Sequence, residues 1–318
     1  MGRLGRYWPE IRSQAKRLLV WLVAAAIVAV AVGLVWAGTP YEATDGSVEA
    51  VEDDDRVVVE RTDGGYVLHP ADGPAETGLV FYPGGRVDPN AYVGSLAGLV
   101  REANVTVVIP RMPLNLAIFD YGAGQTGLRS HAADEAMAEH PFVEHWYVGG
   151  HSLGGAMACR YAADHPDAVE GVVLYASYCD VDVSEGDLSA VSVVGANDTV
   201  LNRDAYERNR DNLPASARVA VLPGLNHTHF GSYTGQDRPT GTSYEEAHER
   251  IDGVVVPWLR TETATEDRII HPHGAAQSLR VTGRTRSPRL LGEGHGPRGY
   301  PVRVGGSGPR VITRGSEG

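Results

Sequence analysis

Ser152 lies in the stretch "GGHSLGG" (149–155), between an apolar segment that ends at Val148 and a segment of helix-forming residues. Glycines stand two residues before and two residues after this serine, and glycine weakens both strands and helix interiors. A G-x-S-x-G pattern between a strand and a helix is typical of a nucleophile elbow, in which a sharp turn exposes the serine hydroxyl. The sequence therefore predicts Ser152 as a catalytic nucleophile; a purely structural turn is the alternative.

A serine nucleophile needs a base, and the base needs an acid that orients it. After a nucleophile elbow, the order along the chain is serine, then aspartate or glutamate, then histidine. Asp198 ends the predicted strand segment 190–198, just beyond its apolar part, and His227 and His229 follow the next apolar segment. The order predicts Asp198 as the acid and one of the two histidines as the base.

Other roles remain open for these side chains. An aspartate after a strand is also common as an Asx turn or helix cap, so Asp180 and Asp182, after the preceding apolar segment, are alternative acids. The pattern His227-x-His229 resembles a metal pair, but the sequence offers no evident third ligand. No metal site is predicted.

An acyl-transfer site also needs backbone N–H groups that stabilise the oxyanion. One comes from the residue after the nucleophile, which is Leu153, and the other from a loop after an earlier strand. The stretch "PGGR" (83–86) follows such an apolar segment. Gly85 is the first candidate and Arg86 the second, and an ordinary strand–helix turn is the alternative.

The elements that would position these residues alternate along the chain. Apolar segments predict strands, of which the first two form a hairpin, at 56–60, 65–69, 78–82, 105–110, 146–150, 169–177, 190–198 and 217–224. Helical patterns cover 90–103, 128–139, 153–164, 203–213 and 243–260, whereas 111–124 is predicted to be a loop. This alternation indicates an α/β fold with a mostly parallel, doubly wound sheet and helices on both faces.

Six segments, in order, resemble the α/β-hydrolase family 5 type, a small serine-hydrolase branch of the α/β-hydrolase superfamily. They are "FYPGGRVDPNAY" (81–92), "RMPLNLAIF" (111–119), "GGHSLGGAMACRYA" (149–162), "VLYASY" (173–178), "VVGANDTV" (193–200) and "GLNHTHFGSYTGQD" (224–237). The resemblance covers about residues 56–260 and implies an α/β-hydrolase fold, a Ser-Asp-His triad and no metal or organic cofactor. It matches His227 to the family's catalytic histidine and makes His229 a neighbour.

Two further expectations concern the surroundings of the site. The segment "ASYCD" departs from the family pattern and puts Cys179 near the rim of the site. Between Ser177 and the strand at 190 there is no room for a cap domain, so an open, shallow site is expected. The two cysteines, Cys159 and Cys179, do not make a disulfide framework or a thiolate zinc site.

Leu18–Ala37 is a run of twenty residues without charge, long enough to span roughly 30 Å of hydrocarbon. Residues 1–17 carry five basic side chains and one acidic one. The positive-inside rule then places the N-terminus in the cytoplasm and the rest of the protein outside. We expect a retained single-pass signal anchor in the lipid bilayer, as family members often have; a cleaved signal peptide is the alternative.

Charge is unevenly distributed over the rest of the chain. Residues 268–318 carry nine arginines and two glutamates, so 38–267 contain 14 of the 28 basic residues and 37 of the 40 acidic ones, a net charge of −23. An acidic domain argues against a nucleic-acid partner. A single lysine, Lys16, among 27 arginines indicates halophilic adaptation or codon bias alone.

The predicted organisation has five parts. They are a basic cytoplasmic N-terminus (1–17), a transmembrane anchor (18–37), a linker (38–55), an α/β-hydrolase domain (56–262) and a Gly/Arg-rich tail without an apolar core (263–318). The predicted function is that of a membrane-anchored, carboxylesterase-like serine hydrolase, which cleaves a small-molecule ester or related acyl bond through a covalent acyl-enzyme. An acyltransferase and a non-catalytic binding protein on the same fold are the alternatives.

Overall fold

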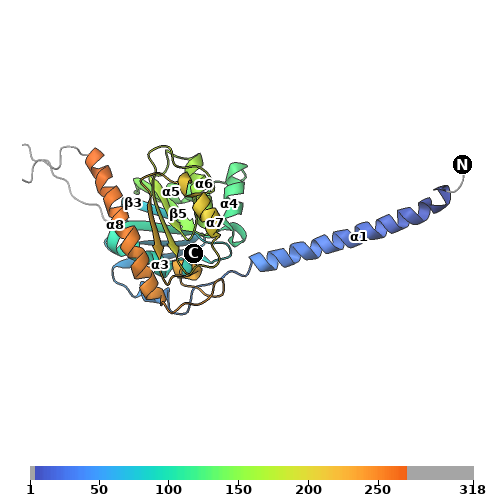
Figure 1. Ribbon diagram of the computed structural model, residues 1–318, viewed down its shortest axis with the longest axis horizontal. Helices are drawn as coiled ribbons and strands as arrows, with labels where there is room; N and C mark the ends of the chain where they lie inside the picture. The colour runs from blue at the N-terminus through green and yellow to red at the C-terminus, as the bar shows by residue number, and fades with distance from the viewer. Residues whose placement is uncertain (1–3, 271–318) are drawn as a thin grey trace, which may run out of the picture. The chain divides into compact units, whose positions relative to one another are not determined.

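The computed structural model describes residues 4–270, and the part of the predicted tail from 271 to 318 lies outside the described residues. An eight-stranded sheet forms the centre, in the order β1-β2-β4-β3-β5-β6-β7-β8 (Figure 1). Strand β2 runs antiparallel to β1 and β4, and all other neighbours are parallel. The strands are β1 (Val57–Thr62), β2 (Gly65–Pro70), β3 (Thr77–Tyr82), β4 (Val105–Pro110), β5 (His145–His151), β6 (Gly171–Tyr175), β7 (Ser189–Gly195) and β8 (Arg218–Leu222).

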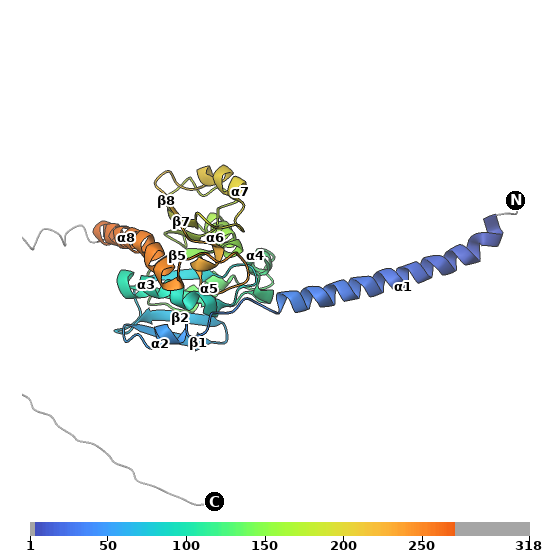
Figure 2. The ribbon, with the colours of Figure 1, turned by 60° about the horizontal axis from the view of Figure 1, so that its bottom comes forward.

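Helices cover both faces of the sheet (Figure 2). The α-helices are α1 (Leu4–Ala37), α2 (Glu49–Glu52), α3 (Val93–Ala103), α4 (Ala117–Gln125), α5 (Ala132–Glu139), α6 (Leu153–Asp164), α7 (Arg203–Arg208) and α8 (Tyr244–Ile270). Short 3₁₀ helices are η1 (Pro89–Tyr92), η2 (Pro113–Asn115), η3 (Arg210–Asn212) and η4 (His227–Phe230). The predicted fold class is confirmed.

Strand β3 shows why both faces need helices. Leu79 and Phe81 point into one apolar cluster with α3 and α8, while Val80 and Tyr82 point into the other with α4, α5 and α6. Successive side chains of a strand point to opposite faces, so a strand that is apolar at every position must be covered on both.

The strand order reverses at β3, which pairs with β4 on one side and with β5 on the other. In open α/β sheets, ligands bind beyond the carboxyl ends of the strands at such a switch point. The segment after β3 contains Gly85, and the segment after β5 contains Ser152. The topology therefore brings these two segments together at the carboxyl-terminal end of the sheet.

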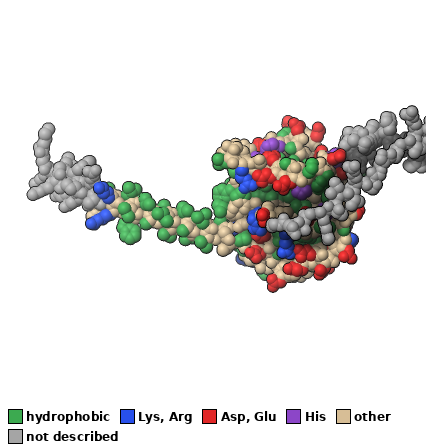
Figure 3. Space-filling view, turned by 180° about the vertical axis from the view of Figure 1, so that it is seen from behind, with side chains coloured by type: hydrophobic (Ala, Val, Ile, Leu, Met, Phe, Trp, Pro, Cys, Tyr) green, Lys and Arg blue, Asp and Glu red, His purple; other side chains and the backbone are tan. Residues whose placement is uncertain are grey.

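Helix α1 is the one helix within residues 4–270 that is long and apolar enough to cross a membrane, over Gln14–Ala37. Figure 3 shows hydrophobic side chains along this helix and acidic side chains over the visible face of the domain. A helix of this composition near the N-terminus fits a membrane anchor and a signal sequence alike.

The segment 111–124 differs from the loop that we predicted, because it contains η2 and α4. Helix α4 includes Gly122 and Gly124, which lower helix propensity. A side chain at Gly124 would overlap the ring of His131, and Tyr121 donates a hydrogen bond to Asp164 of α6. Tertiary packing therefore supports a helix that the local pattern does not indicate.

Two boundaries also differ from the predictions. The expected linker, 38–55, packs on the domain: Tyr41 pairs with Val87, and Val48 and Val51 are buried in the core. At the other end α8 continues to Ile270, so the first residues of the predicted tail are helical. In both segments, the contrast between polar and apolar residues is too weak for composition to mark the boundary.

Candidate active site

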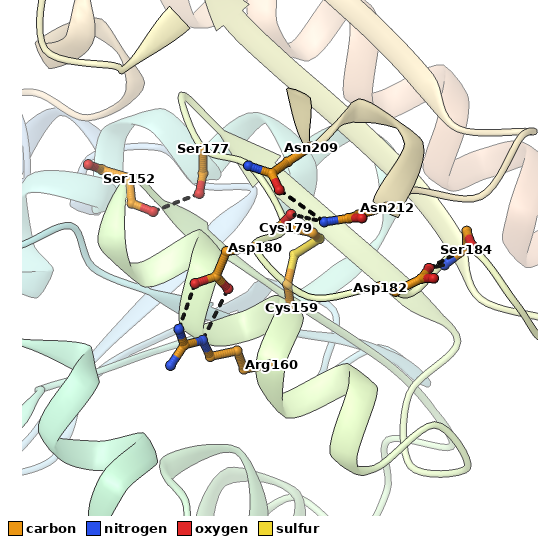
Figure 4. Close-up of a disulfide and its surroundings, with 10 residues drawn as sticks. All are labelled: Ser152, Cys159, Arg160, Ser177, Cys179, Asp180, Asp182, Ser184, Asn209 and Asn212. Carbon is orange, nitrogen blue, oxygen red and sulfur yellow. Dashed lines mark hydrogen bonds and ion pairs between the residues drawn. A yellow bond between two sulfur atoms is a disulfide. The ribbon is translucent and has the colours of Figure 1, made fainter. Parts of the chain in front are cut away.

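The junction of β5 and α6 makes Ser152 a strained turn residue. Its φ and ψ are 53° and −122°, outside the regions that non-glycine residues normally occupy. Its N–H donates to the Tyr175 carbonyl at 3.0 Å, and its own carbonyl accepts from Ser177 Oγ at 2.7 Å (Figure 4). Strained residues held in this way cluster at functional sites.

The glycines on either side of Ser152 allow the close approach of β3. A Cβ on Gly150 would lie 2.6 Å from the Tyr82 carbonyl oxygen, and a Cβ on Gly154 would overlap the same oxygen. The G-x-S-x-G pattern is thus required by backbone contact between β3 and the β5–α6 turn.

Asp198 and His227 meet beyond the ends of β7 and β8. His227 Nδ1 lies 2.8 Å from Asp198 Oδ2, and both side chains are buried. The amides of Val200 and Leu201 donate to Asp198 Oδ1, each at 2.8 Å. A carboxylate only accepts, so Nδ1 carries the proton and Nε2 presents its lone pair. That Nε2 is buried and has no hydrogen-bond partner among the described residues.

His229 has a different environment. Its Nδ1 accepts from the Asn226 amide at 2.9 Å, and its Nε2 lies 3.1 Å from the Thr242 carbonyl. Burial also lowers its pKa, so the ring is neutral at pH 7. Both ring nitrogens hold the loop together, and His227 is the histidine that pairs with Asp198.

The alternative acids lie in other networks. Asp180 forms a two-point ion pair with Arg160, at 3.0 and 2.6 Å (Figure 4). Asp182 accepts from the amide and hydroxyl of Ser184. Asp198 is therefore the one of these three aspartates that contacts His227.

The candidate oxyanion donors come from the turn after β3 and the start of α6. The Arg86 amide already donates to the Asn115 carbonyl at 2.7 Å, and the Gly84 amide donates to Tyr92 Oη at 2.8 Å. Within residues 4–270, no hydrogen bond is found for the amides of Gly85 and Leu153. A methyl group on Gly85 would lie 3.6 Å from the Leu153 side chain. The geometry thus favours Gly85 over Arg86.

A buried pair that the sequence analysis missed, Tyr92 and His151, connects these parts. Tyr92 Oη lies 2.9 Å from His151 Nδ1, and the His151 ring packs on the His227 ring with centroids 4.4 Å apart. Burial, together with neighbouring His227, lowers the pKa of His151 well below its usual value, so the ring is neutral. Tyr92 then donates to Nδ1 while accepting from Gly84. In the sequence, the signal that could have indicated this pair was the histidine directly before Ser152.

The two cysteines form a disulfide between α6 and the segment after β6 (Figure 4). Our expectation of no disulfide framework therefore missed one bond, and Cys179 is wholly buried rather than near the rim. Ser177 and Asp180 flank Cys179 and bond to Ser152 and Arg160, respectively. The disulfide thus belongs to a set of links that hold the segment 177–180 against the β5–α6 turn. Cysteines twenty residues apart on different elements leave no local pattern that predicts their pairing.

Comparison with known proteins gives a family match. The model of the alpha/beta hydrolase family matches residues 78–249, more than half of the chain, which confirms the resemblance drawn from the six segments. No curated protein matches the sequence. Among solved structures, Est1E from Butyrivibrio proteoclasticus is similar over 65% of this chain and 99% of its own, with 12% identity and a TM-score of 0.46.

Proposed function

The chain belongs to the alpha/beta hydrolase family, and on this premise we propose that it is a membrane-anchored serine hydrolase that cleaves an ester or related acyl bond. The observation that carries the proposal is the buried pair of Asp198 and His227, at the carboxyl-terminal end of the sheet that also holds the strained Ser152. His227 Nε2 has no hydrogen-bond partner in the part of the chain that the structure describes. Candidate nucleophile, acid and base also follow one another along the chain in the order typical of the α/β-hydrolase fold.

The proposed reaction follows from these positions. Ser152 Oγ attacks the acyl carbonyl, and its proton passes to His227 Nε2. Asp198 keeps the imidazole in the required tautomer and stabilises the imidazolium that forms. The proton then goes to the leaving alcohol, which departs and leaves the acyl group on Ser152. His227 then takes a proton from water, which attacks the acyl carbon of this acyl-enzyme. The bond to Ser152 Oγ breaks, Oγ takes the proton from His227, and the carboxylic acid is released.

We assign the amides of Leu153 and Gly85 as the hydrogen-bond donors to the negative oxygen of each tetrahedral intermediate. Loss of one such donor typically costs about 2.7–4 kcal/mol of transition-state stabilisation. Both amides are without a protein partner among the described residues, so they are available to a ligand.

The proposed location outside the cytoplasm rests on two observations. Helix α1 is long enough to span a bilayer, with basic residues before its apolar part. The Cys159–Cys179 disulfide is typical of proteins in oxidising compartments. We keep the retained anchor as part of the proposal. Of the five-part organisation we keep the order of the parts, with the segment 38–55 packed on the hydrolase domain.

A fluorophosphonate probe, which reacts with activated serines, tests the proposal on the full chain in membranes. Wild-type protein should be labelled in the membrane fraction and should hydrolyse p-nitrophenyl acetate. Ser152→Ala should abolish labelling and lower kcat by at least about 10³-fold. Ser184→Ala, at a half-buried serine in the loop between β6 and β7, is the matched control and should behave as wild type. Labelling that persists in Ser152→Ala would refute the assignment of the nucleophile, and a soluble form starting near residue 38 would refute the anchor.

A further inference from the structure

The end of α1 is bonded to the two segments that border the proposed oxyanion site. Asn115 Nδ2 donates to the carbonyl of Ala37, the last residue of the helix, at 2.8 Å. The Arg86 guanidinium donates to the Thr39 carbonyl at 2.7 Å and lies over the Trp36 ring at 4.4 Å. Arg86 directly follows Gly85, so the helix end and the site share one loop.

The backbone that links the end of α1 to the loop of Gly85 also keeps the two close together, independently of the side-chain contacts. The Tyr41 amide donates to the Arg86 carbonyl, and Tyr41 is bridged to Val87. Tyr41 lies four residue steps beyond Ala37, and an extended chain covers at most about 3.5 Å per step, or about 14 Å. A bilayer spanned by α1 therefore ends within that distance of the loop that carries Gly85.

The side chains at this junction are of types that settle at a membrane interface. Trp36 and Tyr41 belong to the two aromatic residue types, tryptophan and tyrosine, that are enriched at the level of the lipid headgroups. The Arg86 guanidinium lies over both of their rings, at 4.4 and 5.1 Å. A planar, weakly hydrated guanidinium suits such a site better than an ammonium group.

The segment 114–119, which contains Asn115, exposes apolar side chains on either side of Leu116. Leu114, Ile118 and Phe119 are 45–47% exposed. Between them, Leu116 is half-buried and lies where a methyl group on Gly85 would contact it at 3.6 Å. We call Leu114, Ile118 and Phe119 the apolar rim. Six consecutive residues therefore carry three exposed large apolar side chains, and exposed apolar surface of this kind marks contact with a membrane or an apolar ligand.

We propose that the apolar rim rests on the bilayer and that the enzyme takes its substrate from it: a membrane-resident ester with a long hydrocarbon chain. This inference rests on the proposed function. The acyl chain lies along Ile118 and Phe119, and the ester carbonyl lies against the amides of Gly85 and Leu153. Ser152 Oγ forms a bond to the acyl carbon while the bond to the alkoxy oxygen breaks and the alcohol takes the proton. Water then releases a fatty acid.

The test compares two esters on the full chain reconstituted in phosphatidylcholine vesicles. p-Nitrophenyl acetate dissolves in water and reports the catalytic residues, whereas p-nitrophenyl palmitate dissolved in the vesicles reports access from the bilayer. The double substitution Ile118→Ser with Phe119→Ser should lower kcat/KM for the palmitate ester at least tenfold and change that for the acetate ester less than twofold. Phe142→Ser is the matched control: Phe142 is 41% exposed but precedes β5, at the opposite edge of the sheet from Ser152.

The outcomes separate this inference from the proposed function. Hydrolysis of acetate without hydrolysis of palmitate by the wild type would overturn the inference and leave the serine hydrolase intact. An equal loss on both esters in the double variant, or no loss on either, would also overturn the role of the rim. Absence of hydrolysis of either ester by the wild type would instead refute the proposed function.

Discussion

Asp198 and Asp252 are both buried near histidines, but the surroundings of the two carboxylates differ in their hydrogen-bond donors. Asp198 accepts three hydrogen bonds, from Val200, Leu201 and His227. Asp252, on α8 one turn after His248, has an Oδ1 without a partner among the described residues. Burial raises the pKa of Asp252 to about 7 and lowers that of His248 to about 4.

The difference shows that burial alone does not prepare an aspartate for catalysis. A buried carboxylate remains an anion only where donors replace the water that it has lost. The donors around Asp198 are backbone amides and a histidine, which hold a charge in one orientation. Around Asp252, Gly98 packs so closely that any side chain there would overlap the carboxylate, and Oδ1 has no donor among the described residues. Burial therefore outweighs the attraction of Arg101 and favours the protonated acid. We assign chemistry to Asp198 and packing to Asp252.

Within the comparison of the two aspartates, the largest expected effect is that of Asp198→Asn. An asparagine amide at this place favours the wrong histidine tautomer, so kcat for p-nitrophenyl acetate should fall by about 10³–10⁴-fold with little change in KM. Asp182→Asn, which changes the other alternative acid in its separate network with Ser184, is the control and should change kcat less than threefold. Equal losses in the two variants would mean that Asp198 has no special relation to the reaction.

The second prediction concerns Asp252 and the pH dependence of stability. The unfolded chain ionises this group near its ordinary pKa of 3.8, whereas the folded protein keeps the proton up to about pH 7. Unfolding therefore releases a proton between these values, and stability falls as the pH rises through this range, by on the order of 4 kcal/mol. Asp252→Asn should remove that loss.

Guanidinium unfolding in detergent at pH 5 and pH 8 measures this effect. The stability of Asp252→Asn relative to wild type should increase between the two pH values, and that of Asp72→Asn, an exposed aspartate, should not. Parallel behaviour of wild type and Asp252→Asn would show that the carboxyl is already ionised in the folded protein.

The smallest expected effect compares two wholly buried tyrosines. Tyr92→Phe leaves the Gly84 amide and His151 Nδ1 without their shared partner, which should cost about 1–3 kcal/mol of stability. Because Gly84 precedes Gly85, kcat should also fall about tenfold. The hydroxyl of Tyr175 has no partner among the described residues, so Tyr175→Phe should be neutral or stabilising. Equal stability changes in the two variants would show that the link through Tyr92 contributes nothing.

Much of the fold followed from the sequence because its signals are local. Alternating apolar segments and helical patterns predicted the parallel sheet, because the apolar composition of each strand segment indicates that the strand is buried. The segment 111–124 was mispredicted because its helix depends on Gly124 fitting against His131 and on Tyr121 reaching α6. A helix maintained by such distant contacts has a weak local pattern.

By itself the sequence determined the family, the order of candidate nucleophile, acid and base, and the length of the apolar N-terminal span. These depend on residue types and spacing along one stretch of chain. Only the tertiary structure decided that His227 and not His229 contacts Asp198, and that the Gly85 amide is available while that of Arg86 is bonded. It also decided that the two cysteines pair and that the loop of the site is bonded to the end of α1. These facts depend on the order of the strands in the sheet and on the packing of segments that are distant in sequence. Both bring together residues that no local pattern connects.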